Sequence, residues 1–188
     1  MGDIALPPDD TAPRIVAGRS CGSCSLCCKV VGVDELAKPI GAWCPHCHRQ
    51  KGCAIYEQRP PSCRMFICQW MLAAELGPEW KPDRAKFAML KSAGGRHLTV
   101  FADPGNPSTW RRSPYYENLK HWAAQGVSNT ADLHLVDVIG PRCIVILPDR
   151  DVELGNLGSD EMIHLACRNT AAGVVIDASK IKRAPAAA

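Results

Sequence analysis

The sequence lacks the features of a secreted, membrane-embedded or strongly charged protein. No uncharged stretch approaches the roughly 18 residues that a membrane-spanning helix needs. The first residues have neither the basic start nor the apolar run of a secretory signal peptide, and Leu6 stands where a myristoylation signal requires Ser or Thr. With 22 basic and 19 acidic residues, the net charge is only +3, which argues against a polycationic nucleic-acid binder. These absences predict a cytoplasmic protein that has no membrane partner.

Cysteine, by contrast, is unusually abundant. The chain has 188 residues, of which 46% are hydrophobic, enough for one ordinary globular domain with a small appended module. Eleven residues are cysteine, and nine of them lie between Cys21 and Cys68. Because a reducing cytosol keeps thiols free, this density points to metal binding or catalysis rather than to disulfides.

The distribution of proline, glycine and cysteine divides the chain into four segments. We expect a mobile leader over residues 1–18, a cysteine-cluster metal-binding module over 19–76, an α+β remainder over 77–179 that forms one compact unit with the module, and a tail over 180–188. Frequent glycine and proline keep long regular elements out of the cysteine block. The predicted fold class is therefore α+β, with a loop-rich module packed on a small antiparallel sheet with helices.

Hydrophobic spacing and turn residues predict the regular elements. Apolar residues at helical intervals indicate a first helix over 64–76, which Gly77 and Pro78 end. Runs rich in β-formers predict strands over 97–102, 133–139, 142–147 and 151–154, with Gly140 and Pro141 as the turn of a hairpin. Capping signals predict two more helices, over 114–125 and 159–173.

The spacing of the cysteines is typical of metal ligands. Cys21, Cys24 and Cys27 are separated by two-residue spacers, which let successive thiolates converge on one centre. The adjacent Cys28 points in another direction, so Cys27 and Cys28 suit two metals or a polynuclear centre better than one ion. Two further groups follow along the chain, namely Cys44, Cys47 and Cys53, then Cys63 in a loop and Cys68 on the predicted helix.

Two stretches of this block resemble the YkgJ-like cysteine-cluster proteins, a family described as carrying a zinc- or iron-chelating domain. The run from Cys21 to Cys28 matches the family's CxxCxxCC, and CAIYEQRPPSCRMFIC, from Cys53 to Cys68, is similar to its C-x-I-Y-x-x-R-P-x-x-C-R pattern. The resemblance covers about fifty residues and implies eight metal ligands: Cys21, Cys24, Cys27, Cys28, Cys44, Cys53, Cys63 and Cys68. A similar cluster accompanies flagellin lysine methylases, so the resemblance permits an enzyme but assigns no catalytic residue.

The charges around the block are compatible with such a centre. From Arg19 to Cys68 there are seven Lys or Arg and three Asp or Glu, a balance of +4. Eight thiolates with two divalent metals, or with two cubane cores of charge +2, carry −4, which the basic residues offset. Arg59 and Arg64 flank Cys63 and are candidate donors to its thiolate sulfur, the alternative being exposed surface arginines.

Other interpretations of the cysteines are weaker. Cys44-Pro45-His46-Cys47 resembles the active site of thioredoxin-like thiol oxidases, but no buried strand precedes it and Gly52 interrupts any helix after it. His46 and His48, like Cys47, depart from the family pattern, so the ligands around Cys44 stay open. Outside the block, Cys143 on a predicted strand and Cys167 on a predicted helix suit simple burial in the core.

The rest of the chain contains no recognisable catalytic motif. Its glycine runs lack the strand-to-helix pattern that binds phosphates or dinucleotides. An aromatic and basic group, Trp110-Arg111-Arg112 with Tyr115 and Tyr116, could stack on nucleic-acid bases, although the near-neutral charge disfavours this.

Two functions follow from the sequence. The first is a cytoplasmic metal-chelating protein that binds an iron–sulfur cluster or Zn²⁺ and takes part in electron transfer or an unidentified reaction. The second is a structural zinc module that holds the loops in place while the α+β part recognises a protein or nucleic-acid partner. The thiolates alone do not distinguish iron from zinc.

Overall fold

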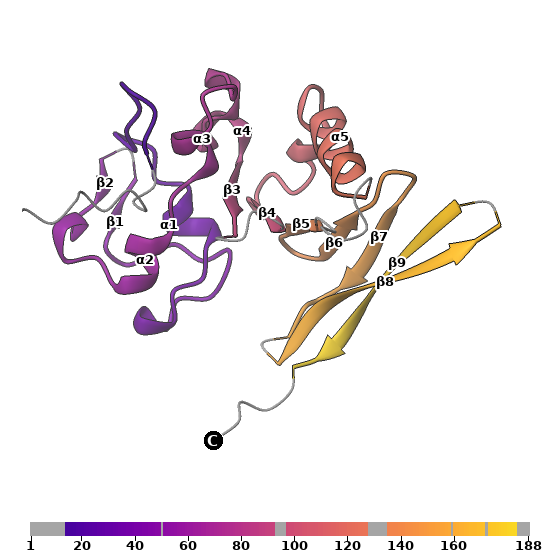
Figure 1. Cartoon of the computed structure of the whole chain (residues 1–188). Coiled ribbons are helices and arrows are strands. Elements are labelled where there is room, and N and C mark those ends of the chain that lie inside the picture. The colour runs from indigo at the N-terminus through magenta and orange to yellow at the C-terminus, as the bar shows by residue number, and fades with distance from the viewer. Residues whose placement is uncertain are drawn as a thin grey trace, which may run out of the picture.

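A five-stranded mixed sheet forms the centre of the molecule (Figure 1). The structure is a computed structural model and describes residues 14–49, 51–92, 97–127, 135–158, 160–171 and 173–183. The strands lie in the order β3 (Phe87–Lys91), β4 (His97–Ala102), β5 (Leu135–Ile139), β6 (Cys143–Ile146) and β7 (Asp151–Gly155). The α+β class is confirmed, as are the strands predicted over 97–102, 151–154 and the two arms of the hairpin. Strand β3 was not expected.

One neighbouring pair in the sheet is parallel. Strands β4 and β5 run in the same direction because the chain between them contains helix α5 (Tyr115–Val127), whereas the other neighbours are antiparallel. A parallel pair needs such a crossover, and the helix then covers one face of the sheet. The small antiparallel sheet expected from the sequence is thus a mixed one.

The face beneath α5 contains the main hydrophobic core. Strand alternation turns Val100 and Val138 toward this face, where they pack with Leu119 of α5. Aromatic rings extend the core, since the centroid of Trp80 lies 4.9 Å from that of Tyr115 and 6.0 Å from that of Phe87. The short elements η3 (Pro78–Trp80) and α4 (Pro82–Ala85) bring Trp80 to this position.

The opposite face of the sheet is covered by two separate parts of the chain. Ala88 and Phe101 pack against Leu26 and Val30 of the cysteine module. At the other end of the sheet, Val145 packs with residues of a two-stranded ribbon. Figure 1 shows the module and the ribbon on opposite sides of the sheet's middle strands. The sheet therefore acts as the common support for both.

The ribbon replaces the last predicted helix. Strands β8 (Glu161–Thr170) and β9 (Gly173–Lys182) pair antiparallel over their whole length. Ile163 and Leu165 alternate along β8 and face the sheet with Ile176, a period of two that a helix would not satisfy. Cys167 consequently lies on a strand and is exposed, so its predicted burial in a helix is wrong. Residues 180–182, assigned to the tail, belong to β9.

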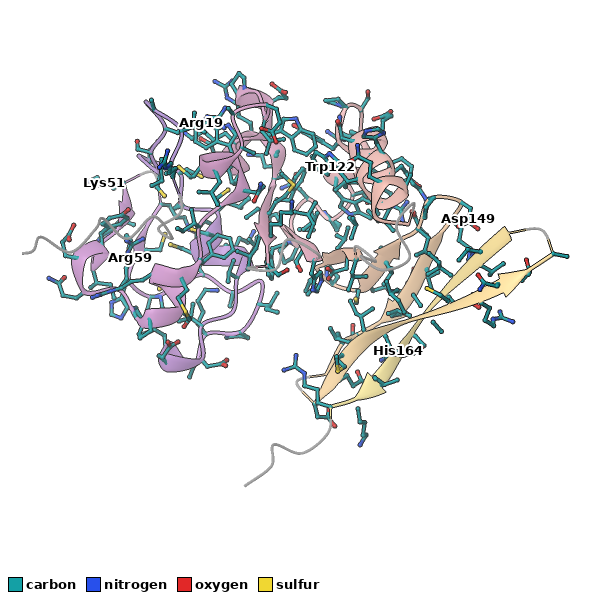
Figure 2. The ribbon with its side chains drawn as sticks, viewed as in Figure 1. Arg19, Lys51, Arg59, Trp122, Asp149 and His164 are labelled. Carbon is teal, nitrogen blue, oxygen red and sulfur yellow. The ribbon has the colours of Figure 1, made fainter. Side chains whose placement is uncertain are left out.

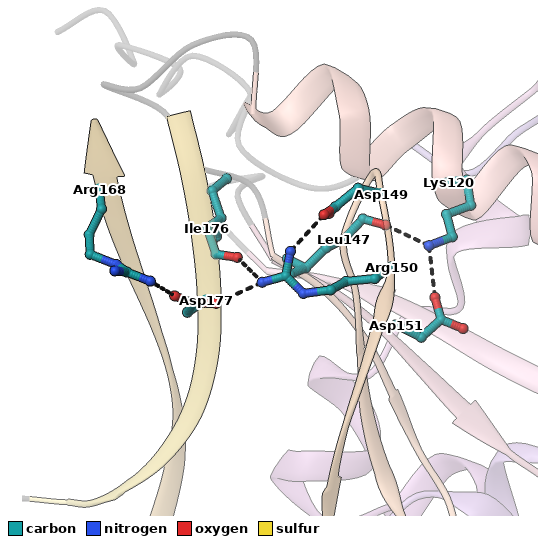
Figure 3. Close-up of polar contacts among 8 residues, drawn as sticks. All are labelled: Lys120, Leu147, Asp149, Arg150, Asp151, Arg168, Ile176 and Asp177. Carbon is teal, nitrogen blue, oxygen red and sulfur yellow. Dashed lines mark hydrogen bonds and ion pairs between the residues drawn. The ribbon is translucent and has the colours of Figure 1, made fainter. Parts of the chain in front are cut away.

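Polar contacts fasten the ribbon to the turn between β6 and β7 (Figure 3). Arg150 donates to the carbonyl of Ile176 and to Oδ1 of Asp177, each at 2.7 Å. Arg168, from the other strand of the ribbon, pairs with Oδ2 of Asp177 at 2.6 Å. A single carboxylate thus joins both strands of the ribbon to the sheet.

The first predicted helix is divided into two short ones. Helix α2 (Pro61–Met65) ends at Phe66, whose backbone is extended and whose ring packs edge-on against Phe101 at 6.1 Å. Helix α3 (Gln69–Leu72) starts three residues after Phe66. Cys63 lies within α2, so its predicted position in a loop is wrong. Proline is tolerated at the first position of a helix, and Pro61 opens α2 there. In the described part of the chain, no helix has the length and apolar character needed to cross a bilayer.

Asp137 places a buried carboxylate in the middle of the sheet. Its Oδ1 atom lies 2.5 Å from Nε2 of His97 and accepts a hydrogen bond from Thr99 at 3.0 Å, both residues coming from the parallel neighbour β4. Among the described residues, Oδ2 has no hydrogen-bond partner. The contacts of Asp137 with His97 and Thr99 therefore join β4 to β5, in addition to the backbone hydrogen bonds between the two strands.

Asp151 links the edge strand β7 to α5 and provides a test of the fold. Lys120 and Arg111 pair with its two carboxylate oxygens at 2.9 and 2.6 Å. Burial alone would raise the pKa of Asp151, but the hydrogen bonds from Lys120 and Arg111 outweigh it and lower the pKa below its ordinary value. The ionised form is therefore more stable in the folded protein than in the unfolded chain.

We expect Asp151→Asn to lower the free energy of unfolding at pH 7 by about 1.5 to 3 kcal/mol, the range for hydrogen bonds to charged groups. Since the folded pKa is depressed, this contribution is present above the unfolded value of about 3.9 and disappears as the pH falls through the folded pKa. Urea denaturation of both proteins between pH 7 and pH 3 measures this. The two stability curves should converge at acid pH, and a constant separation would contradict the assignment.

Candidate metal centre

All eight cysteines implied by the resemblance line one cavity. Its volume is about 420 Å³, and it lies within the cysteine module, next to the face of the sheet that Phe101 occupies. Figure 2 shows the sulfur atoms gathered near Lys51 and Arg59. The cysteines in its wall are Cys21, Cys24, Cys27, Cys28, Cys44, Cys53, Cys63 and Cys68. Segments as much as 47 residues apart in sequence therefore contribute to one site.

Short elements and turns position these side chains. Cys27 and Cys28 open α1 (Cys27–Val30), and the amide of Cys44 donates to the carbonyl of Cys28 at 2.9 Å. Cys53 ends β2 (Gly52–Cys53), which pairs with β1 (Cys47–His48). Cys63 lies on α2, and Cys68 precedes the first residue of α3. No element here exceeds five residues among those described, as the frequent glycine and proline predicted.

Gly52 allows two of these turns to meet. Its φ angle is +94°, and a Cβ atom at this position would lie 3.2 Å from the carbonyl oxygen of Gly22. A side chain is disfavoured by both the backbone conformation and the space. The close approach brings Cys53 next to the turn that carries Cys21 and Cys24.

Arg19 fixes the beginning of the cysteine block to the segment that follows its end. Its guanidinium donates to the carbonyls of Trp70, Ala73, Ala74 and Leu76, with distances of 2.7 Å to Ala73 and to Leu76. The same group lies over the ring of Trp70, 4.8 Å from its centroid. Because Cys21 is two residues after Arg19 and Cys68 two before Trp70, this contact holds the first and last cysteines of the block near each other.

Within the cavity the thiols fall into two neighbourhoods. The thiols that act on Cys68 electrostatically are Cys24 and Cys21. Those that act on Cys63 are Cys28, Cys44 and Cys53. Cys28 also contacts Cys27 and Cys47 through side-chain hydrogen bonds. The cavity thus has one end formed by Cys68 with Cys21 and Cys24, and another formed by Cys28 with Cys44, Cys53 and Cys63.

Burial raises the pKa of several of these thiols. It raises the pKa of Cys68 to about 11 and, with the charge of Cys28, that of Cys47 to about 11. Hydrogen bonding to Cys27, together with burial, raises the pKa of Cys28 further. These groups are therefore protonated at neutral pH in the free protein, and a metal that binds them as thiolates must displace their protons.

The thiols share a cavity without forming a closed coordination sphere. All eleven cysteines of the chain are free. Among the described residues, no three Cys, His, Asp or Glu side chains are close enough together to hold a metal ion as they stand. Coordination would require the cavity walls to draw together until sulfur lies about 2.3 Å from a metal such as zinc.

The other candidates from the sequence lie around this cavity or away from it. Arg59 is part of its wall, and its guanidinium stacks on Tyr56 at 3.6 Å. Arg64 is outside the wall and donates to the carbonyls of Arg59 and Glu57, so it supports the loop that carries Arg59. Cys47, His46 and His48 are likewise outside the wall, although the Cys47 thiol reaches Cys28.

The weaker interpretations find no support in the geometry. Cys44 begins a turn that ends at Cys47, the first residue of the two-residue strand β1, so the motif does not open a long helix as in a thiol oxidase. Trp110 and Tyr115 are buried, and Tyr116 donates to Asp151, so these rings serve the core rather than an exposed stacking surface. Cys143 is buried on β6, away from the cavity, as expected.

One residue of the cavity wall was missed by the sequence reasoning. Lys38 is only 5% exposed and lines the cavity with the cysteines. Burial lowers its pKa, while negative charge on Cys44, Cys28, Cys27 and Cys63 would act in the opposite direction. The available signal was a lysine directly before Pro39 in the middle of the cysteine block. Its burial depends on contacts that spacing does not reveal.

Comparison with known proteins adds no identification. No family model, curated protein or solved structure matches this chain. The likeness to the YkgJ-like proteins therefore remains a prediction from the motif residues, and the function must be argued from the cavity.

Proposed function

We propose that this protein binds iron, as an iron–sulfur cluster, or zinc through about eight cysteine thiolates in the cytoplasm, with a role in electron transfer where the metal is iron. The observation that carries the proposal is the single cavity lined by all eight predicted ligands. Free thiols from five parts of the module that converge on one space are difficult to explain as core packing.

The chemistry of the cavity wall fits a thiophilic metal. Thiolates select zinc, Cu(I) and iron–sulfur clusters over hard ions such as Mg²⁺ and Ca²⁺. In the wall, cationic Lys38, Lys51 and Arg59 accompany the thiols, and the wall contains no Asp or Glu among the described residues. Cysteine thiolates from both ends of the cavity would hold the group, and the basic residues would offset the negative charge that the thiolates introduce.

The space favours more than one metal ion. The cavity, with a volume of about 420 Å³ before its walls draw together, is larger than one ion with four thiolates at about 2.3 Å requires. The two neighbourhoods, around Cys68 and around Cys28, also suit a polynuclear centre or a pair of sites. This agrees with the adjacent Cys27 and Cys28, which one ion would not use equally well.

Metal analysis tests the proposal directly. Protein purified without oxygen should contain either iron with acid-labile sulfide and visible absorption, or colourless zinc in a fixed ratio to the chain. Elemental analysis by mass spectrometry, a sulfide assay and an absorption spectrum distinguish these results. Protein that remains free of iron and zinc after expression with either metal, and that binds neither in titration, would refute the proposal.

A structural zinc module is the second candidate. It is favoured by the shortness of the elements in the module, none longer than five residues among those described, since closed zinc sites often stabilise such loops. In this case the zinc sites would hold the module against β3 and β4 while another surface binds a partner. Stoichiometric zinc without redox activity would support this candidate over electron transfer.

A further inference from the structure

Lys38 is a buried cation whose charge is not balanced by a carboxylate. Its ammonium donates to the carbonyls of Lys29, Val31 and Pro39, with distances of 3.2 Å to Lys29 and 3.3 Å to Pro39. Among the described residues, no Asp or Glu pairs with it. Carbonyl dipoles solvate the ammonium but do not neutralise it, and a buried charge is costly unless it is paired.

The position of Lys38 indicates which groups can supply the missing charge. Two of its carbonyl partners, Lys29 and Val31, lie one and three residues after Cys28, and the amide of Cys44 donates to the carbonyl of Cys28. The ammonium therefore lies at the end of the cavity formed around Cys28. Its electrostatic neighbours are Cys27, Cys28, Cys44 and Cys63, all in the cavity wall.

The neighbouring cations of the module have other roles. Lys29 pairs with Asp103 at 2.5 Å, so its charge is already balanced within the protein. Lys51 lies in the cavity wall but is exposed, where water screens its charge, and Arg59 is half-buried with its guanidinium stacked on Tyr56. Among the wall residues, Lys38 alone combines a full charge, burial and proximity to four thiols.

We propose that Lys38 is the built-in counter-cation of the metal centre and favours a negatively charged metal–thiolate group at the Cys28 end of the cavity. This inference rests on the proposed function. Four thiolates around one divalent ion, or around a cubane core of charge +2, leave a net charge of −2. Such a group would provide the opposite charge that the buried ammonium lacks, so Lys38 is a positioning residue and not a ligand.

Lys38→Gln tests this role because glutamine keeps hydrogen-bond donors for the carbonyls and removes the charge. We expect the affinity for Zn²⁺, measured by competition with a chromophoric chelator, to fall about 10- to 100-fold, as for other residues that support metal ligands. Lys38→Arg should restore most of the affinity. Lys182→Gln, which removes an exposed charge from β9, outside the cavity wall, should leave the affinity within about threefold of the wild type.

A redox readout applies if the centre contains iron. Reduction adds negative charge, which a nearby cation stabilises, so Lys38→Gln should lower the reduction potential relative to the wild type and to Lys182→Gln. Circular dichroism and the melting temperature of the metal-free variants show whether the fold is retained. A folded Lys38→Gln protein with wild-type zinc affinity, or equal losses in Lys38→Arg and Lys38→Gln, would overturn the role of its charge.

Labelling of the wild-type protein provides the test if Lys38→Gln does not fold. Acetylation of lysines, followed by mass spectrometry, should be at least tenfold slower at Lys38 in zinc-loaded than in metal-free protein, and unchanged at the exposed Lys182 of β9. Equal rates at Lys38 would contradict the proposal. Wild-type protein that binds no metal refutes the proposed function itself, whereas metal binding that is indifferent to Lys38 refutes only this inference.

Discussion

Cys63→Ser should deprive the protein of most of the metal bound at the Cys28 end of its cavity, whereas Cys143→Ser should leave the metal content unchanged. Cys63 is in the cavity wall and has Cys28, Cys44 and Cys53 as electrostatic neighbours. A serine hydroxyl is a hard and weakly acidic ligand that does not replace a thiolate. The loss should exceed the roughly 10- to 100-fold effect that is typical of residues that only support a ligand.

Cys143 is the matched control for this substitution. It is 2% exposed on β6 and lies outside the cavity wall. Both variants therefore replace one sulfur by oxygen, but only Cys63→Ser removes a predicted ligand. Elemental analysis of the two purified proteins gives the metal content per chain. If Cys143→Ser lost metal while Cys63→Ser retained it, the assignment of ligands would be wrong.

Cys47→Ser tests whether Cys47 belongs to the set of metal ligands. Cys47 contacts Cys28 but does not line the cavity, so its replacement should retain more metal than that of Cys63. Metal loss as complete as in Cys63→Ser would instead place Cys47 among the ligands. This comparison settles the ambiguity around Cys44 that the departures from the family pattern leave in the sequence.

Removing the metal should loosen the cysteine module while the sheet stays folded. The module contains helices of four or five residues and strands of two, which are not stable by themselves. Binding of structural zinc contributes about 10 to 16 kcal/mol in zinc-finger peptides, and this energy becomes folding energy. The sheet, by contrast, has its own core between α5 and strands β3 to β6.

Hydrogen exchange measures this difference along the chain. After chelation, amides over residues 19–68 should exchange at least tenfold faster, while those of β4 and β5 keep their protection. Addition of the metal to the chelated protein should restore protection in the module. Uniform loss over the whole chain, or no change in either part, would show that the metal does not hold the module in the way proposed.

Local sequence patterns predicted four of the five strands of the central sheet, but they missed β3 and gave a helix in place of β8. Strand β4 and the β5–β6 hairpin follow from short apolar runs and a turn at Gly140, all read from neighbouring residues. Asp160 and Glu161 suggested a helix start over 159–173, yet each residue of β8 pairs with a strand that follows in the sequence. Ile163 and Leu165 had the alternation of a strand, but only the facing Ile176 and the sheet beneath decide between the two forms.

At the candidate site, too, the sequence predicted what depends on residue spacing and missed what depends on contacts between distant segments. Cysteine spacing and the family resemblance selected eight residues that the fold brings to one cavity. Spacing did not show that Cys47 lies outside the wall, because this depends on the pairing of β1 with β2. It also did not reveal Lys38, whose burial arises from carbonyls of α1 and the turn after it.

The contact of Arg19 with the segment after α3 has a consequence for how a metal would enter. Joining Cys21 to Cys68 through an ion alone would require closure of a flexible loop of about fifty residues, and the entropic penalty of closure grows with the logarithm of loop length. The hydrogen bonds from Arg19 to the carbonyls of Ala73 and Leu76 already close this loop when the chain folds. An ion that binds both outermost thiols therefore faces a smaller entropic penalty, because folding has already closed most of the loop between them.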